Sequence, residues 1–231
     1  MLWCNTDILT ITASITGALK DTLIVDDHWK MILQGLWATI VISVLSIICG
    51  TLLGYGIYSL TKSRRDWVRK FAQWYRVIVR GTPMMVLLFL IFYTILRGHY
   101  GILAAVIAFS INFSNFACSV IQSSNDSVGA GLIDAGRALG MTNMQVFRYV
   151  VAPQALHNAM PAYKFQVVSL IKSTSVVGYV AIQDLTRTID TIRLSTGETL
   201  LPLLIATSIY FLLAWLIVKL LDSIVKKVNR T

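Results

Sequence analysis

One long segment without any charged side chain most limits what this sequence can fold into. It runs from Met31 to Thr61. Because about 20 mainly apolar residues suffice for a helix to cross the bilayer core, the segment predicts a membrane-spanning helix. Hydrophobic residues make up 56% of the chain and charged residues only 13%, against about 25% charged in ordinary globular domains. The sequence therefore indicates a multi-span membrane protein and excludes both a soluble globular domain and a disordered chain.

Four further apolar segments make up a transmembrane domain over residues 31–227. We expect its spans at about 31–61, 81–97, 101–122, 165–183 and 199–218. None of these segments alternates strictly between apolar and polar residues, so a membrane barrel is not indicated. The predicted fold class is an all-α integral membrane protein with five transmembrane helices. Residues 1–30 are expected to be an extracytoplasmic segment, with Ile8–Leu19 as an interfacial helix or a frayed end, and residues 228–231 a short tail.

The distribution of basic residues predicts the orientation of the chain. Most of the 20 Lys and Arg residues fall in three segments that five spans place on one side. These residues are Lys62, Arg64, Arg65, Arg69, Lys70, Arg76, Arg80, Arg137, Arg148, Lys164, Lys219, Lys226, Lys227 and Arg230. Loops rich in Lys and Arg stay in the cytoplasm, so the N-terminus is predicted outside and the C-terminus inside. The net charge of +9 is then mainly a topology signal, and nucleic acid is not expected as a partner.

The longest predicted cytoplasmic segment has the pattern of two short helices around a glycine. Gly140 suits the end of the first helix, Asn143 is expected to cap the second, and Pro153 to interrupt or bend the chain. The segment also carries many apolar residues: Val128, Leu132, Leu139, Met141, Met144, Val146, Phe147 and Tyr149. Since apolar surface outside the membrane packs against something, residues 128–156 predict a docking site for a partner protein, rather than an ordinary linker.

Three motifs in this sequence resemble one family. The stretch from Asp134 to Pro153, with Asp134, Ala135, Gly136, Arg137, Gly140 and Pro153 in order, resembles the EAA loop of ATP-binding-cassette (ABC) importer permeases. Asp134 stands where the family has Glu, and Gly136 where it has a second Ala. The motif Arg80-Gly81-Thr82-Pro83 and the stretch from Ser169 to Ser175 resemble the permeases for polar amino acids.

The resemblance implies a type I importer permease that couples ATP hydrolysis by a separate chain to alternating access for a polar amino acid. It also implies the partners: ABC ATPase subunits, a second permease subunit (the same chain or another), an extracytoplasmic solute-binding protein and the lipid bilayer of a bacterial inner membrane. No phosphate-binding GxxxxGK[ST] loop occurs in the sequence, so ATP and Mg²⁺ are expected in the ATPase and no cofactor on this chain.

Two groups of polar residues are candidates for the solute pathway. Asn112, Asn115, Ser119 and Gln122 recur every three or four residues, which places them on one helical face. This face lines a pathway or makes structural hydrogen bonds between helices. Ser169, Lys172 and Ser173 form the second group, in which Lys172 either reaches the membrane interface or lies along the pathway.

Other features concern packing and the end of a span. Thr82 is expected to cap a helix whose first residue is Pro83, with Arg80 at the headgroups or against a partner. Gly50 and Gly54 permit close contact between helices. His99 and His157 are isolated in the sequence, so no metal site is expected.

Three other functions compete with an amino-acid importer. One is an ABC permease for another small solute, such as methionine or an organic anion. A self-sufficient secondary transporter or channel would show internal repeats and more ionisable groups at mid-membrane. An intramembrane hydrolase or transferase would need a nucleophile–base pair or a metal cluster, and neither His-Glu-x-x-His nor Gly-x-Ser-x-Gly occurs. The chain is therefore predicted to be a permease subunit and not an enzyme.

Overall fold

The computed structural model describes residue 22 and residues 27–228, and these residues contain helices and no strand. Their order is α2 (His28–Thr61), α3 (Asp66–Gly81), α4 (Met84–Phe89), the π-helix η2 (Leu90–Ile95), α5 (Gly101–Asp126), α6 (Ala130–Ala138), α7 (Asn143–Val146), the π-helix η3 (Phe147–Val151), α8 (Ala152–Ser173), the 3₁₀-helix η4 (Thr174–Val180), α9 (Leu185–Thr196) and α10 (Leu200–Val228). The helix or frayed end predicted at Ile8–Leu19 lies outside the described residues.

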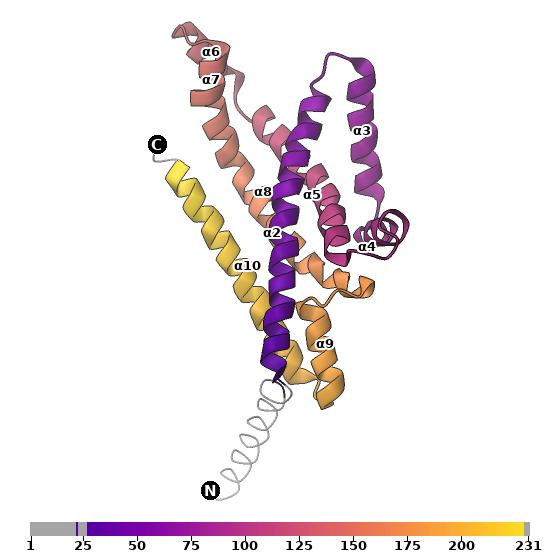
Figure 1. The fold of residues 1–231 in the computed structure, drawn as a ribbon. Coiled ribbons are helices and arrows are strands. Elements are labelled where there is room, and N and C mark those ends of the chain that lie inside the picture. Colours follow the sequence, from indigo (N-terminus) through magenta and orange to yellow (C-terminus); the bar gives the residue numbers. More distant parts are fainter. Residues whose placement is uncertain (1–21, 23–26, 229–231) are drawn as a thin grey trace, which may run out of the picture.

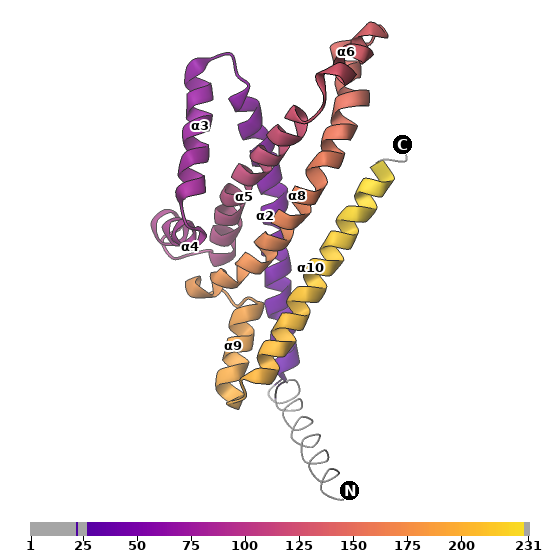
Figure 2. The same cartoon turned by 180° about the vertical axis from the view of Figure 1, so that it is seen from behind.

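The long helices α2, α5, α8 and α10 run lengthwise along the molecule, and α2 covers most of the distance between its two ends (Figure 1, Figure 2). One end carries the α2–α3 turn, α6 and α7, and α10 runs toward it. The opposite end carries α9 and the start of α2. Helix α3 returns beside α2 from the first end and stops about half-way, where α4 turns across the bundle.

Three described helices, α2, α5 and α10, are long and apolar enough to cross a membrane by themselves, and two bent helix pairs raise the number to five. In the first pair, α3 meets α4 and η2 at 108°. In the second, the continuous helix from Asn143 to Val180 meets α9 at 58°. The five predicted spans correspond to this upper number, with two of them broken.

The second span differs from its prediction. Instead of one helix over 81–97, α3 covers residues that were expected to be a loop, and only Met84–Ile95 continues beyond it. At 1.5 Å per residue Met84–Ile95 extends about 18 Å, short of the roughly 30 Å bilayer core. Thr82 does not cap the following helix, because its hydroxyl donates to the Ile78 carbonyl at 2.8 Å.

Pro83 explains why α3 stops where it does. It lacks an N–H group and pushes the preceding residue out of the helical region. Thr82 accordingly has φ −90° and ψ 121°, which is extended backbone. Pro83 itself is the residue before α4 and not its first helical residue. The sequence Thr82-Pro83 therefore ends one helix and re-aims the chain.

The fourth span also differs. The helix expected from Phe165 begins at Ala152, and beyond Ser173 the chain continues as 3₁₀-helix. Pro153 lies in the first turn of α8 and does not interrupt the chain, because the π-helix η3 connects α7 to α8 ahead of it. A wider π-turn accommodates a residue without an N–H donor. The last span, expected to end at 218, extends as α10 to Val228.

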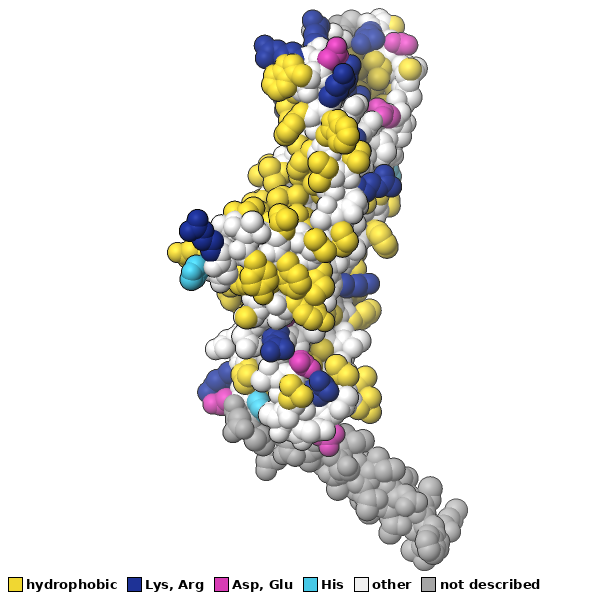
Figure 3. Space-filling model, turned by 90° about the vertical axis from the view of Figure 1, so that its right-hand side faces the viewer, with side chains coloured by type: hydrophobic (Ala, Val, Ile, Leu, Met, Phe, Trp, Pro, Cys, Tyr) yellow, Lys and Arg dark blue, Asp and Glu magenta, His cyan; other side chains and the backbone are white. Residues whose placement is uncertain are grey.

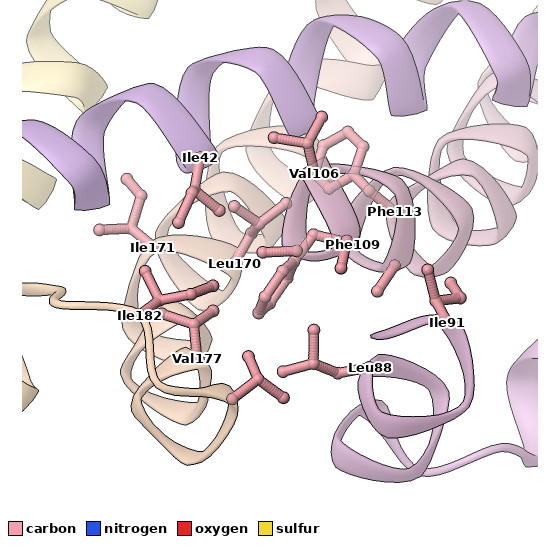
Figure 4. Close-up of a cluster of buried hydrophobic side chains, with 14 of the residues drawn as sticks. Ile42, Leu88, Ile91, Val106, Phe109, Phe113, Leu170, Ile171, Val177 and Ile182 are labelled. Atoms are coloured by element: carbon pink, nitrogen blue, oxygen red, sulfur yellow. The ribbon is translucent and has the colours of Figure 1, made fainter. Parts of the chain in front are cut away.

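The core lies where α2, α4, α5, α8 and η4 converge. Ile42, Leu88, Phe109, Ile171 and Val177 are buried there, and their side chains point toward one another (Figure 4). The face of α2 toward α5 carries small residues: Ser43, Ser46, Gly50 and Gly54 are all buried. The two helices therefore approach closely, and the predicted role of Gly50 and Gly54 in helix packing is confirmed by their contacts with α5.

Candidate functional site

The polar face of α5 borders a cavity of about 590 Å³. Asn112, Asn115 and Ser119 line it, on the one helical face that their spacing predicted, whereas Gln122, the fourth residue of that face, is not among the lining residues. Other walls come from α3 and α8, and the remaining lining residues are Gln73, Arg76, Val77, Val79, Arg80, Phe116 and Gln166. Five of the lining side chains carry an amide or hydroxyl group, which binds polar solutes through hydrogen bonds: Gln73, Asn112, Asn115, Ser119 and Gln166. We call this space the Arg76 cavity.

Arg76 connects α3 to the predicted polar face. Its Nη1 donates to Gln122 Oε1 and its Nη2 donates to Ser119 Oγ, both at 3.0 Å. The sequence pattern had placed Arg76 in a basic cytoplasmic loop. The signal that could have located it is the spacing from Ala72 and to Val79, both buried, which puts Arg76 on the inward face of an amphipathic helix.

Tyr75, the residue before Arg76, also links α3 to α5. Its hydroxyl and the Ser114 hydroxyl form a 2.7 Å hydrogen bond in which either oxygen can donate. Two neighbouring side chains of α3 therefore bond to α5. This pairing holds the guanidinium of Arg76 at the cavity instead of leaving it on a flexible side chain.

The second predicted group lies elsewhere. Ser169, Lys172 and Ser173 line a separate cavity of about 300 Å³ on α8 and do not border the Arg76 cavity. Lys172 is exposed, and it also lines an apolar groove between α8 and α10. The residue of α8 that does reach the Arg76 cavity is Gln166, which sequence reasoning did not single out.

The predicted coupling loop forms a compact helix pair, α6 and α7. Asp134 and Arg137 are an exposed ion pair at 3.5 Å. Gly136 is buried, and a Cβ atom there would lie 3.1 Å from Val146 Cγ2. Gly140 has φ +79°, the left-handed backbone that glycine adopts most readily. The two helices are therefore packed against each other at Gly136, and the chain turns at Gly140, as expected for that glycine.

The cap of α7 differs by one residue from the prediction. Thr142, not Asn143, is the N-cap: its hydroxyl accepts from the Gln145 amide at 3.3 Å, and Gln145 Oε1 accepts from the Thr142 amide at 2.8 Å. This reciprocal pair is a capping box. It fixes the start of the helix that continues through η3 into α8.

Large apolar side chains remain exposed on this helix pair and on η3. Leu139 is 79% exposed and Met144 73% exposed, and Leu132, Phe147 and Tyr149 are also exposed. They lie at the end of the molecule that carries α6 and α7. Within the part of the chain that the structure describes, nothing covers this surface, which is typical of a docking site.

Comparison with known proteins identifies the family. Residues 46–230 match the family model described as the inner membrane component of binding-protein-dependent transport systems. The chain belongs to this family. It is a multi-pass inner-membrane permease of an ABC importer and a transport subunit, not an enzyme. The family implies an ATPase and a binding protein as partners.

Relatives and solved structures agree with this assignment. The L-cystine transport system permease protein TcyB of Bacillus subtilis is 30% identical, over 92% of this chain and 93% of its own length. The octopine transport system permease protein OccM of Rhizobium radiobacter is 28% identical, over 82% of each chain. The crystal structure of an amino acid ABC transporter with histidines has a chain 29% identical, with a TM-score of 0.76 over 87% of this chain and 95% of its own. The methionine transporter MetNI, at 22% identity and a TM-score of 0.71 over 89% of this chain and 99% of its own, shares the fold. The predicted type I importer permease fold is therefore confirmed.

Proposed function

We propose that this chain forms the solute pathway of an importer for a polar amino acid, with the Arg76 cavity as part of that pathway. Support comes from the relatives, which are named for octopine and cystine, and from the solved amino acid transporter. The observation that carries the proposal is the cavity itself, where α3, α5 and α8 present amide, hydroxyl and guanidinium groups inside an otherwise apolar bundle. A permease for methionine or an organic anion is the second candidate.

The proposed orientation puts the end with α6 and α7 in the cytoplasm, the N-terminus outside and the C-terminus inside. Basic side chains gather at that end around the α2–α3 turn, and apolar side chains fill the middle of the same face (Figure 3). Lys62, Arg64 and Arg65 belong to this turn. This placement supports the positive-inside argument even though Arg76 faces the cavity rather than a loop.

An ATPase subunit is proposed to dock on α6 and α7, where Asp134 and the exposed apolar side chains face outward. ATP and Mg²⁺ belong to that subunit in this proposal, and a second permease subunit completes the pathway. Because the helix from Asn143 to Val180 is continuous, a movement of α7 is carried directly into α8. Helix α8 contributes Gln166 to the cavity, so ATP-driven motion of the loop alters the cavity wall.

An ion pair links helix α10 to α8. Lys164 Nζ lies 2.6 Å from Asp222 Oδ1, and both side chains are partly buried. The pair joins the middle of α8 to the C-terminal part of α10. Alternating access then consists of α8 and α10 moving together against the α2–α5 core.

The first test is Asp134→Lys, with co-purification of the ATPase as the readout. The tagged chain is extracted in mild detergent from its native membrane, and the associated proteins are identified. We expect the wild-type chain to retain an ABC ATPase and the variant to retain at most about a tenth of that amount, because charge reversal at an interface costs a few kcal/mol and each 1.4 kcal/mol is about a factor of ten.

Asp66→Lys is the matched control. Asp66 forms the same kind of exposed i,i+3 pair, with Arg69 at 2.6 Å, and it lies at the same end of the molecule. We expect this variant to retain the ATPase. Equal loss in both variants would mean that general charge, and not the α6–α7 loop, governs the complex. A stable chain without an ATPase from any variant would contradict the proposed coupling site.

A further inference from the structure

The Arg76 cavity carries fixed positive charge and no fixed negative charge. Arg76 and Arg80 line it, and its other polar lining residues are neutral amides and a hydroxyl. None of its lining residues is Asp or Glu. An ionisable side chain inside a membrane bundle is costly and usually has a partner of opposite charge. The charge balance of this cavity therefore points to a ligand that supplies the anion.

Several basic residues in the described part of the chain are paired with a carboxylate, and Arg76 is not. Arg69, Arg137 and Arg193 each have a carboxylate within 4 Å, as do Arg187 and Lys164. Among the described residues, no carboxylate lies within ion-pair distance of Arg76 or Arg80. The other described basic residues without a carboxylate partner are exposed, as Arg80 is, whereas Arg76 is partly buried. Arg76 is thus the partly buried cation of the described residues that lacks a carboxylate partner.

Arg76 is held in place with hydrogen-bonding capacity to spare. A guanidinium has five N–H donors, and the bonds to Gln122 and Ser119 engage one N–H on Nη1 and one on Nη2. The remaining donors suit the planar, two-pronged geometry of a carboxylate. Because α5 already fixes the guanidinium, little side-chain entropy is lost when an anion binds.

We infer that Arg76 binds the carboxylate of the transported solute and that the cavity selects amino acids with neutral or acidic side chains over cationic ones. This inference rests on the proposed function and names the substrate class of the same cavity. Arg80, exposed at the cavity wall, adds a second positive charge that attracts anions and repels a lysine- or arginine-like side chain.

The neutral groups of the cavity complete a site for an amino acid. Asn112 and Asn115 lie on the same face of α5 as Ser119, and their amide oxygens accept hydrogen bonds from an α-ammonium group. Their amide nitrogens and that of Gln166 donate to a polar side chain. The volume of about 590 Å³ lies within the roughly 300–1,000 Å³ of small-molecule sites.

The test measures direct binding to the permease–ATPase complex purified through a tag on this chain, without the binding protein. Isothermal titration uses a panel of neutral and acidic L-amino acids, L-lysine and L-arginine, and then the amino alcohol of the tightest ligand, which lacks the carboxylate. We expect lysine, arginine and the amino alcohol to bind at least about tenfold more weakly than the tightest ligand, since a charged hydrogen bond contributes on that order.

Variants test whether Arg76 is the residue that binds the carboxylate. Arg76→Gln is expected to weaken the tightest ligand by about tenfold or more and to leave the amino alcohol unchanged, while Arg76→Lys keeps part of the affinity. The control is Arg69→Gln, on the same helix but paired with Asp66, which should bind like the wild-type chain. The ligand panel is measured on the wild-type complex, so its result does not depend on whether any variant folds.

The outcomes separate this inference from the proposed function. If amino acids bind but lysine binds as tightly as the best ligand, or if the amino alcohol does, the carboxylate inference is wrong and the amino-acid importer stands. The same holds if a folded Arg76→Gln complex keeps full affinity. If no amino acid binds to a complex that retains its ATPase, both the inference and the amino-acid substrate are wrong.

Discussion

Gly54→Leu is expected to leave no folded, monodisperse protein in detergent. A Cβ atom at Gly54 would lie 2.6 Å from Ala117 Cβ, 2.7 Å from the Ser114 carbonyl oxygen and 3.0 Å from the Cys118 amide nitrogen. Two of these three atoms belong to the backbone of α5, so no side-chain rotation relieves the contact. Replacing a helical glycine stabilises a helix by about 1 kcal/mol, whereas overpacking costs about 3 kcal/mol or more. The clash therefore outweighs the gain in helix propensity.

The matched control for this variant is Gly56→Leu, two residues further on α2. A Cβ atom at Gly56 would have nothing within 4 Å. We expect this variant to elute from size-exclusion chromatography and to unfold on heating like the wild-type chain. If Gly54→Leu were equally stable, α2 and α5 would not pack as closely as the structure shows.

The long apolar helices could be predicted from the sequence because length and hydropathy alone decide them. Helix α2 begins three residues before its predicted start and ends at the predicted Thr61, and α5 begins at the predicted residue 101. The glycine turn at Gly140 could also be predicted, because a left-handed backbone selects glycine locally. These features depend on the segment itself and not on what it packs against.

Helix α3 could not be predicted in the same way. Its residues are charged on one side and apolar on the other, so an average over the segment resembles a basic loop. The inward face of α3 is defined only by its contacts with α5, namely the hydrogen bonds of Tyr75 and Arg76. The wall of the cavity that α3 forms was therefore missed, although the polar face of α5 was predicted.

Lys172 is the opposite case, because sequence reasoning singled it out and it does not border the Arg76 cavity. It lies in an apolar stretch next to serines, a pattern that leaves both the membrane interface and the pathway open, and the structure places it in a different cavity from Asn112 and Asn115. Its position depends on how α8 rotates against α5, and the spacing within one helix does not contain that angle. The role of Lys172 remains a prediction without support from the geometry of the Arg76 cavity.

Asp184→Ala is expected to lower the thermal stability more than the replacement of an exposed carboxylate does. Asp184 has no solvent exposure. Its carboxylate caps α9 by accepting from the amides of Thr186 at 3.2 Å and Arg187 at 3.0 Å. Its Oδ2 also lies 3.5 Å from the Tyr210 hydroxyl of α10, and that hydroxyl bonds to Thr186 Oγ1 at 2.8 Å. Removal leaves these partly buried donors without the carboxylate.

The residues next to Asp184 attach α9 to the core. The Leu185 amide donates to Thr39 Oγ1 of α2 at 3.2 Å, and a Cβ atom at Gly35 would lie 2.8 Å from the Asp184 carbonyl oxygen. An N-cap contributes about 1 kcal/mol, and leaving buried groups unsatisfied costs about 1–3 kcal/mol more. We therefore expect a loss of about 3 kcal/mol, measured as a lower midpoint of thermal unfolding in detergent.

Two variants test whether capping explains this loss. Asp184→Asn keeps an oxygen acceptor for the α9 amides and should recover more than half of the stability. Asp190→Ala removes a partly exposed carboxylate from the same helix, where its pairs with Arg187 and Arg193 are i,i+3 neighbours, and should cost less than about 1 kcal/mol. If Asp190→Ala were as damaging as Asp184→Ala, charge on α9, and not the buried cap against α2 and α10, would hold this end of the permease together.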